Sequence, residues 1–332
     1  MEWWVMAFDR FTLLRPSGLT KRRLLAALFA TCLALPVGAK GTNTETQVPG
    51  TSPTITDYIL WYRNYDSPAV KALVELALDK TPEYGAYRLI RSSEMGQGRA
   101  LRELAKGDTK VVDIINVATS PQREQSLLSV PIPIDGGLLG FRVCVVNKEN
   151  RKRFSRVHSL IDFQQQRFRI GQGLHWPDTD ILRANGVSVV TSARFEILFR
   201  MLDNDRFDCF ARGVNEVLFD LERLKDAGMV VEPYLLFGYP MPSYLFAGPN
   251  NIVVAHRLQL GLERAIQDDS FAGYLATYYL EAIERLRLNE RTVLMLKNPY
   301  LTEDSEPIAR RALESLRRRI ERAKPLTSAL RP

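Results

Sequence analysis

Two arginines stand at positions from which a guanidinium could hold a carboxylate. Arg123 lies shortly after the apolar run Val111 to Ala118, and Arg212 directly follows the apolar run Phe207 to Ala211. If both runs are strands, the arginines occupy equivalent strand ends, which is where open α/β sheets bind ligands. Because a guanidinium forms two parallel charge-assisted bonds to a carboxylate, the spacing predicts an anion clamp, with the hydroxyl of Thr119 beside it.

Aromatic and polar residues in three further loops are candidates for the rest of a small-molecule site. Tyr65 follows the first apolar run and offers a ring for stacking. Gln97 and Arg99 stand in a glycine-rich stretch that opens a predicted helix, as do His175 and Trp176 in a second one. Backbone N–H groups at such helix starts favour anions. We therefore expect these residues to contact the ligand.

No motif in the chain carries an enzymatic mechanism that we recognise. The sequence lacks a Gly-x-Ser-x-Gly elbow, a His-Glu-x-x-His pair and a phosphate loop ending in Gly-Lys-Ser or Gly-Lys-Thr. Its histidines, His158, His175 and His256, are far apart, whereas metal ligands are usually closely spaced. We expect a protein that is not an enzyme and has neither metal nor cofactor.

The elements that must position these residues alternate between strand and helix. The apolar residues Val70, Leu73, Val74, Ala77 and Leu78 have the spacing of one helix face. Strands are predicted at 55–62, 84–90, 111–118, 139–146, 167–171, 187–191, 207–211 and 229–237, with helices between them. Residues 254–288 are predicted to be helical, with breaks near Asp268 and Ser270. The pattern calls for mostly parallel sheets flanked by helices.

Two such α/β units in one chain predict two lobes joined by two hinge crossovers. Residues 55–140 and 243–332 are expected to form lobe one, because the helical third part has no sheet of its own to cover. Residues 145–236 are expected to form lobe two.

The first 39 residues have the order of a secretory signal peptide. Basic residues at 21–23 precede the apolar run Leu24 to Leu35, and a small-residue pattern ends at Ala39. The run is too short to span a bilayer, which takes roughly 20 residues. We expect cleavage after Ala39, a flexible tether over 40–54 and a periplasmic protein.

The charge of the chain and its cysteines limit the kinds of partner and the disulfide bonds that we expect. The chain has 45 Lys plus Arg against 38 Asp plus Glu, a modest excess that predicts no nucleic-acid partner. An exported protein can form disulfides, but Cys144 and Cys209 each lie in an apolar run, so two buried free thiols are favoured over a bridge. The basic helix predicted at 308–322 is interpreted as a solvated terminal helix, with a membrane-surface helix as the alternative.

At these residues the chain resembles bacterial extracellular solute-binding proteins of family three, the amino-acid-type periplasmic binding proteins of the two-lobed type II fold. Residues 118–124 are similar to that family's Thr-x-x-x-Arg stretch, whose arginine holds the ligand's α-carboxylate and here is Arg123. Residues 173–178 and 207–213 resemble the Gly-x-x-Trp-Pro-Asp and Phe-Asp-x-Phe-x-Arg-Gly segments of a little-characterised branch. The resemblance covers about Ile55 to Tyr279.

The resemblance implies a monomer that closes its lobes around a carboxylate-bearing solute and delivers it to an ABC permease. Gly213 stands where the family has an acid for the ligand's ammonium group, which favours a ligand that is more anionic or depends less on an ammonium group. One alternative is a sensory module without transport. Another is a cyclohexadienyl-dehydratase-like enzyme, which would need a carboxylate in the cleft, but Glu196 and Glu216 are predicted on helix faces toward solvent.

Overall fold

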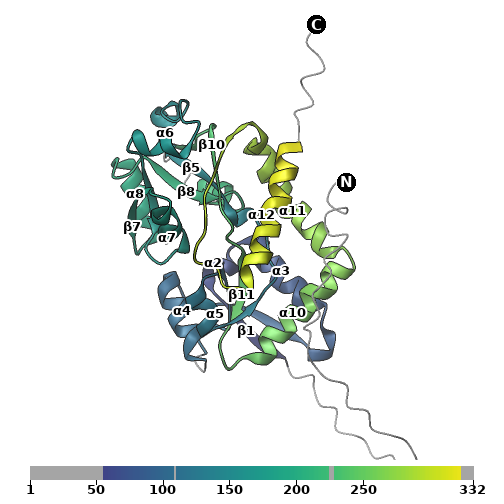
Figure 1. Cartoon of the computed structure of the whole chain (residues 1–332). Coiled ribbons are helices and arrows are strands. Elements are labelled where there is room, and N and C mark those ends of the chain that lie inside the picture. Colours follow the sequence, from purple (N-terminus) through teal and green to yellow (C-terminus); the bar gives the residue numbers. More distant parts are fainter. Residues whose placement is uncertain (1–54, 108–109, 224–227, 323–332) are drawn as a thin grey trace, which may run out of the picture.

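The computed structural model describes residues 55–107, 110–223 and 228–322, which form two lobes of mixed α/β structure (Figure 1). The expected fold class, two sheets flanked by helices, is confirmed. The predicted signal peptide and tether lie outside the described residues. Among the residues that are described, no helix is long and apolar enough to cross a membrane.

The first lobe is built on a five-stranded sheet with the order β2-β1-β3-β11-β4. Its strands are β1 (Thr56–Leu60), β2 (Tyr87–Arg91), β3 (Ile114–Ala118), β4 (Leu128–Val130) and β11 (Ser243–Ala247). Its helices are α2 (Tyr62–Tyr65), α3 (Pro68–Asp79), η1 (Pro82–Tyr84), α4 (Gln97–Lys106), α5 (Pro121–Ser126) and α10 (Ile252–Gln267). β1 is parallel to β2 and β3, and β11 is antiparallel to β3 and β4.

Helix α3 shows why the local sequence folds as it does. The Oγ atom of Ser67 accepts a hydrogen bond from the Val70 N–H, and Pro68 occupies the first helical turn, where it costs no hydrogen bond. The predicted apolar stripe of α3 is buried in the core, so this helix is confirmed. It packs against α10, which itself contacts β4 and β11.

The second lobe has a seven-stranded sheet in which β12-β10-β5-β8-β6-β7 form a row and β9 pairs with β5. Its strands are β5 (Phe141–Asn147), β6 (Arg169–Gly173), β7 (Ser188–Ser192), β8 (Cys209–Gly213), β9 (Met229–Val231), β10 (Leu235–Gly238) and β12 (Thr292–Met295). Its helices are η3 (Lys148–Lys152), α6 (Leu160–Gln165), α7 (Pro177–Ala184), α8 (Phe195–Asp203) and α9 (Val217–Arg223). The strand ends of β6 and β8 point toward the first lobe.

Two chain segments connect the lobes side by side. Residues 131–140, which end in η2 (Leu138–Gly140), lead from β4 to β5, and residues 239–242 lead from β10 to β11. The Tyr239 N–H donates to the Gly140 carbonyl at 3.0 Å. A β-carbon at Gly140 would lie 2.5 Å from the Tyr239 carbonyl oxygen, so the close approach of the two segments requires glycine.

The C-terminal part departs from the predicted division into lobes. Residues 243–332 were expected in lobe one, yet β12 pairs in parallel with β10 in the second sheet. Arg291 holds this segment there by donating to the carbonyls of Glu232 (2.6 Å) and Leu235 (3.0 Å). Without β12, the edge of β10 would present unpaired backbone groups, which this short extended segment satisfies. The helices of this part are α11 (Ser270–Arg285), η4 (Leu288–Glu290) and α12 (Ser305–Arg322).

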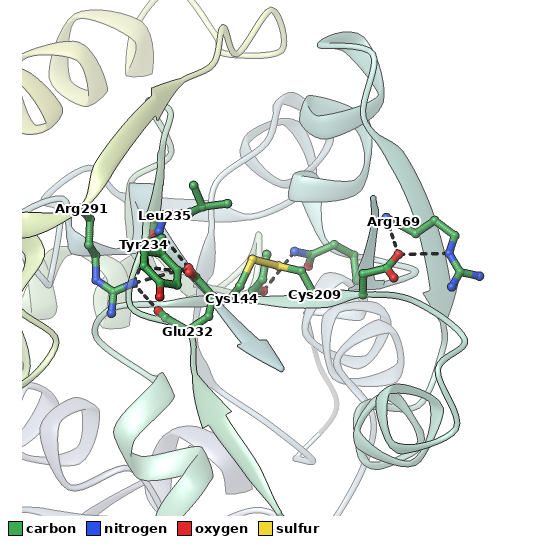
Figure 2. The surroundings of a disulfide bond; sticks show 10 residues. Cys144, Arg169, Cys209, Glu232, Tyr234, Leu235 and Arg291 are labelled. Carbon is green, nitrogen blue, oxygen red and sulfur yellow. Dashed lines mark hydrogen bonds and ion pairs between the residues drawn. A yellow bond between two sulfur atoms is a disulfide. The ribbon is translucent and has the colours of Figure 1, made fainter. Parts of the chain in front are cut away.

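Cys144 and Cys209 form a disulfide, which corrects the expectation of two free thiols (Figure 2). The bond joins the neighbouring strands β5 and β8, whose antiparallel register brings the two cysteines to a Cα separation of 5.0 Å. Both residues are fully buried. The bridge therefore lies inside the core of the second lobe, next to the Glu232 and Arg291 pair in Figure 2.

Two helical glycines should respond in opposite ways to the addition of a methyl group. In α10, a β-carbon on Gly261 would lie 1.9 Å from the Ala77 carbonyl oxygen of α3, so Gly261→Ala forces the helices apart. We expect a loss of about 1 to 3 kcal/mol in the free energy of unfolding. In α11, Gly273 has no atom within 4 Å of that position, so Gly273→Ala should stabilise by up to about 1 kcal/mol. Urea unfolding of both variants measures this, and equal effects would contradict the helix contact.

Candidate functional site

A cavity of about 630 Å³ lies between the lobes, lined by residues of both. Its walls come mainly from the segments that follow β1, β2, β3, β6, β7 and β8, together with the start of β5. Because the strand ends converge here, side chains from distant parts of the sequence share one enclosed space. Three buried arginines, one from the first lobe and two from the second, and the three carboxylates nearest to them are described below. The other charged residues of the lining are less buried: Arg63, Glu94, Arg194, Glu196 and Arg223.

Arg123 is the arginine that the first lobe contributes. Its guanidinium donates to the Ala118 carbonyl, to Oε1 of Gln97 (3.1 Å) and to the carbonyl of His175 (2.8 Å). All three acceptors are uncharged, and the described residues give Arg123 no ion pair. The side chain is 7% exposed, and burial lowers the pKa of Arg123 to about 10, although Asp178 acts in the opposite direction. Arg123 is therefore a buried cation without a countercharge of its own.

Arg142, on β5, is the first of two arginines from the second lobe. Its Nη2 lies 2.8 Å from Oδ1 of Asp178, and its Nη1 lies 3.3 Å from Oε2 of Glu216. Its Nε donates to the hydroxyl of Tyr239 in the hinge. Burial opposes the charge of this group, yet Asp178, Tyr239 and Glu216 together raise the pKa of Arg142 above its usual value.

Arg212, at the end of β8, also has acidic partners. Its Nε donates to Oδ2 of Asp220 at 2.7 Å, and its Nη2 lies 3.3 Å from Oε2 of Glu216. The guanidinium stacks 4.9 Å from the ring of Trp176, which in turn stacks on Phe210. These contacts hold the Arg212 guanidinium in place, and the two carboxylates neutralise its charge.

The buried charges at the cavity differ between the two lobes. In the second lobe, Arg142 and Arg212 are matched by three carboxylates, which leaves this cluster a formal charge of −1. The more exposed Arg194, Arg223 and Glu196 of the same lobe bring its lining to a formal charge of zero. The carboxylates are those of Asp178, Glu216 and Asp220. Glu216 is shared by both arginines; burial acts to raise the pKa of Glu216, but Arg212 and Arg142 bring it below its usual value. The first lobe contributes Arg123, with a charge of +1.

The predicted site residues divide into two groups. The structure brings five of them to the cavity: Gln97, Arg123, His175, Trp176 and Arg212. It does not bring Tyr65, Arg99 or Thr119 there. Tyr65 packs partly buried against the core, Arg99 is exposed on α4, and the hydroxyl of Thr119 is turned to Glu124.

Three acids and one arginine of the cavity were missed or misjudged from the sequence. Arg142 is hidden within an apolar run, and Asp178 and Asp220 were not considered as site residues. Glu216 was expected to face solvent, but α9 begins only at Val217, so Glu216 lies in the turn after β8 and faces the cavity. A buried arginine in a strand is a signal that a partner acid must be nearby.

The lobes touch across the cavity. The bond from Arg123 to the His175 carbonyl crosses the cleft, and so does the ion pair of Arg63 with Glu196 at 3.4 Å. A β-carbon on Gly98 would lie 2.8 Å from the His175 ring, so the lobes are in direct contact there as well. No group of His, Cys, Asp and Glu suited to a metal occurs among the described residues.

Asp135, in the first crossover, links the hinge to the cavity wall. It is 1% exposed, it accepts from the N–H groups of Gly137 and Leu139, and it accepts from the side chain of Asn215 at 2.7 Å. Gly137 has φ +98°, a conformation that favours glycine. Burial raises the pKa of Asp135 to about 6.

This raised pKa predicts a pH dependence of stability. The native state holds the Asp135 proton up to about pH 6, while the unfolded chain loses it near pH 3.9. The contribution of Asp135 is therefore fully present below about pH 4 and is lost as the pH rises through 6, by up to about 3 kcal/mol. In Asp135→Asn the decline in unfolding free energy between pH 4 and 6 should be smaller than in the parent. Parallel curves for the two proteins would contradict this.

Comparisons with known proteins give structural likeness only. The chain matches no protein-family model and no curated protein sequence. Solved structures that it resembles each align with 68% of the chain. They include an amino acid ABC transporter substrate-binding protein from Streptococcus pneumoniae bound to L-arginine (TM-score 0.49, 14% identity, 93% of that chain). Two others are an ancestral arginine-binding protein (0.48, 14%, 98%) and an ancestral amino-acid-binding precursor of cyclohexadienyl dehydratase (0.48, 9%, 95%). At these values the ligands of those proteins are not transferred to this chain.

Proposed function

We propose that the protein is a periplasmic solute-binding protein that closes its lobes around a small, amino-acid-like solute bearing a carboxylate, and that it serves an ABC importer. It acts by binding, without catalysis. The hinge of two adjacent crossovers and the contacts across the cleft support closure as the mode of capture. The proposal predicts that the bond from Arg123 to the His175 carbonyl and the ion pair of Arg63 with Glu196 are present in the closed form and broken in the open form.

The observation that carries this proposal is the uncompensated charge of Arg123 in an enclosed cavity. A buried cation that donates only to neutral acceptors is costly, and a ligand carboxylate would supply the missing countercharge. A charge-assisted bond of this kind contributes about 1.5 to 3 kcal/mol. We therefore assign the carboxylate of the solute to Arg123.

The charges of the second lobe change the expected nature of the ligand. A clamp formed by Arg123 and Arg212 favoured an anionic solute, but Arg212 already has Asp220 and Glu216 as partners. A second carboxylate on the ligand would compete with these acids. A cationic group facing Glu216 fits the buried cluster there, in which three carboxylates meet two arginines, so a solute with both charges is favoured over a dianion.

Three carboxylates in the cleft, those of Asp178, Glu216 and Asp220, could support an enzymatic role. Burial raises the pKa of Asp220, but the Arg212 guanidinium binds its carboxylate. A general acid needs a raised pKa, so that it is protonated near neutral pH. The pKa of Glu216 is instead lowered by Arg212 and Arg142, against the effect of burial. This favours binding over dehydratase chemistry. Assays of purified protein with prephenate-like acids would show turnover if the enzymatic alternative were correct.

A thermal-shift screen tests the proposed function. The exported protein is heated with amino acids, dicarboxylates and aromatic acids, because a ligand at 100 times its Kd adds about 2.7 kcal/mol of stability. We expect at least one amino acid to raise the Tm, and dicarboxylates of matched length to have a smaller effect. A shift caused by dicarboxylates alone, or by no carboxylate at all, would contradict the proposal.

A further inference from the structure

A strongly basic segment lies at the end of the second lobe that is remote from the cavity. Residues 148–158 include Lys148, Arg151, Lys152, Arg153 and Arg156 but a single acid, Glu149. All five basic residues are exposed. Among the described residues, Arg153 alone of these five has an ion pair, with Asp208 at 3.0 Å. The segment is thus a concentration of unneutralised positive charge.

The buried residues of the segment anchor it to the lobe, and its basic side chains face solvent. Phe154 is fully buried and its ring stacks on those of Phe168 (4.5 Å between centroids) and Phe163 (6.3 Å). The segment is therefore folded onto α6 and β6. Arg169, at the start of β6, shares Asp208 with Arg153 and extends the basic surface.

An apolar side chain is exposed beside these cations. Ile161, in the first turn of α6, is 63% exposed, and it is the one large apolar residue so exposed among 148–169. Exposed cations close in sequence to an isolated exposed apolar side chain suit an interface of lipid headgroups and acyl chains. A stable protein partner would instead need a broad, apolar interface core, which these residues do not provide.

The position of the segment leaves the cleft free. β5 runs from the hinge at Phe141 to Asn147 and enters the segment there, whereas β6 begins at Arg169 and ends at the cavity at Gly173. Figure 1 shows α6 at the end of the second lobe that is remote from α4 and α5. A partner bound to this end of the second lobe would therefore leave the cavity uncovered.

We propose that residues 148–158, with Ile161, form a docking surface for anionic phospholipid headgroups. The surface attracts the headgroup phosphates through its five cations, and Ile161 enters the headgroup boundary. Docking would hold the protein at a membrane surface while its lobes remain able to open. The inference does not depend on the identity of the solute.

Vesicle sedimentation tests the docking surface. The protein, purified from the periplasmic or secreted fraction, is mixed with vesicles of phosphatidylcholine alone or with 30 mol% phosphatidylglycerol. We expect binding to the anionic vesicles, and its loss at high salt. The variant Lys148→Gln/Arg151→Gln/Arg156→Gln should bind them roughly a hundredfold more weakly, since each lost cation near an anionic surface weakens binding several-fold. These side chains are exposed, so thermal unfolding should be unchanged.

The basic helix α12 provides the matched control. Arg310→Gln/Arg311→Gln/Arg318→Gln removes the same number of positive charges from another exposed site and should weaken binding less than threefold. A greater loss in this control, or equal binding of the parent to both kinds of vesicle, would overturn the proposal. So would parent-like binding by the triple variant of the segment.

Discussion

Replacing Arg123 with alanine is expected to weaken binding of the solute found in the thermal-shift screen by roughly tenfold to a hundredfold. The physical reason is the loss of a charge-assisted contact of about 1.5 to 3 kcal/mol at a buried site. Arg123→Lys should restore only part of the affinity, because an ammonium lacks the planar pair of donors. Isothermal titration calorimetry measures these affinities directly.

The control for this prediction is Arg99→Ala. Arg99 has the same residue type and belongs to the first lobe, but it is exposed and does not line the cavity. Its replacement should leave affinity unchanged. Because Arg123 is buried and donates to three acceptors, its replacement changes folding stability too, and the Tm of each free protein must be measured alongside. Equal affinities of parent and Arg123→Ala would refute the role of Arg123.

Loss of the disulfide is expected to have the largest effect on stability. The bond between Cys144 and Cys209 closes a loop over a sequence separation of 65 residues, and bonds of this kind contribute about 2 to 5 kcal/mol. The double variant Cys144→Ser/Cys209→Ser should unfold at a correspondingly lower urea concentration than the parent. Solute affinity should fall as well, because β5 and β8 carry Arg142 and Arg212.

Treatment with a reductant separates the effect of losing the disulfide on stability from the effect of the serine substitutions. Dithiothreitol should lower the unfolding midpoint of the parent and leave that of the double variant unchanged. If reductant left the parent unaffected, with thiol labelling confirming that the bond had opened, the stabilising role of the bridge would be wrong.

The fold was predictable because its elements carry local signals. The stripe of α3 repeats with the helical period, and the apolar runs that became β3, β5 and β8 are bounded by polar residues and turns. The lobe membership of β12 was not predictable in this way. It depends on a pairing with β10, far away in the sequence, and a short strand with intermediate burial has no pattern of its own.

The site was predictable only where a residue lies at the end of a strand or shortly after it. Arg123 and Arg212 were found by that rule, whereas Arg142 lies within β5 and its partners Asp178 and Glu216 come from other segments. The pairing of Arg212 with Asp220 was also beyond the sequence, because it depends on how α9 turns back against β8. The disulfide required the register of β5 against β8 in the same way.

The most direct test of the account is a crystal structure of the protein with the solute that gives the largest thermal shift. The account predicts that the solute lies between the lobes, with its carboxylate within hydrogen-bond distance of the Arg123 guanidinium and its cationic group facing Glu216. A solute bound outside the cavity, or one whose carboxylate contacts Arg212 in place of Arg123, would contradict it.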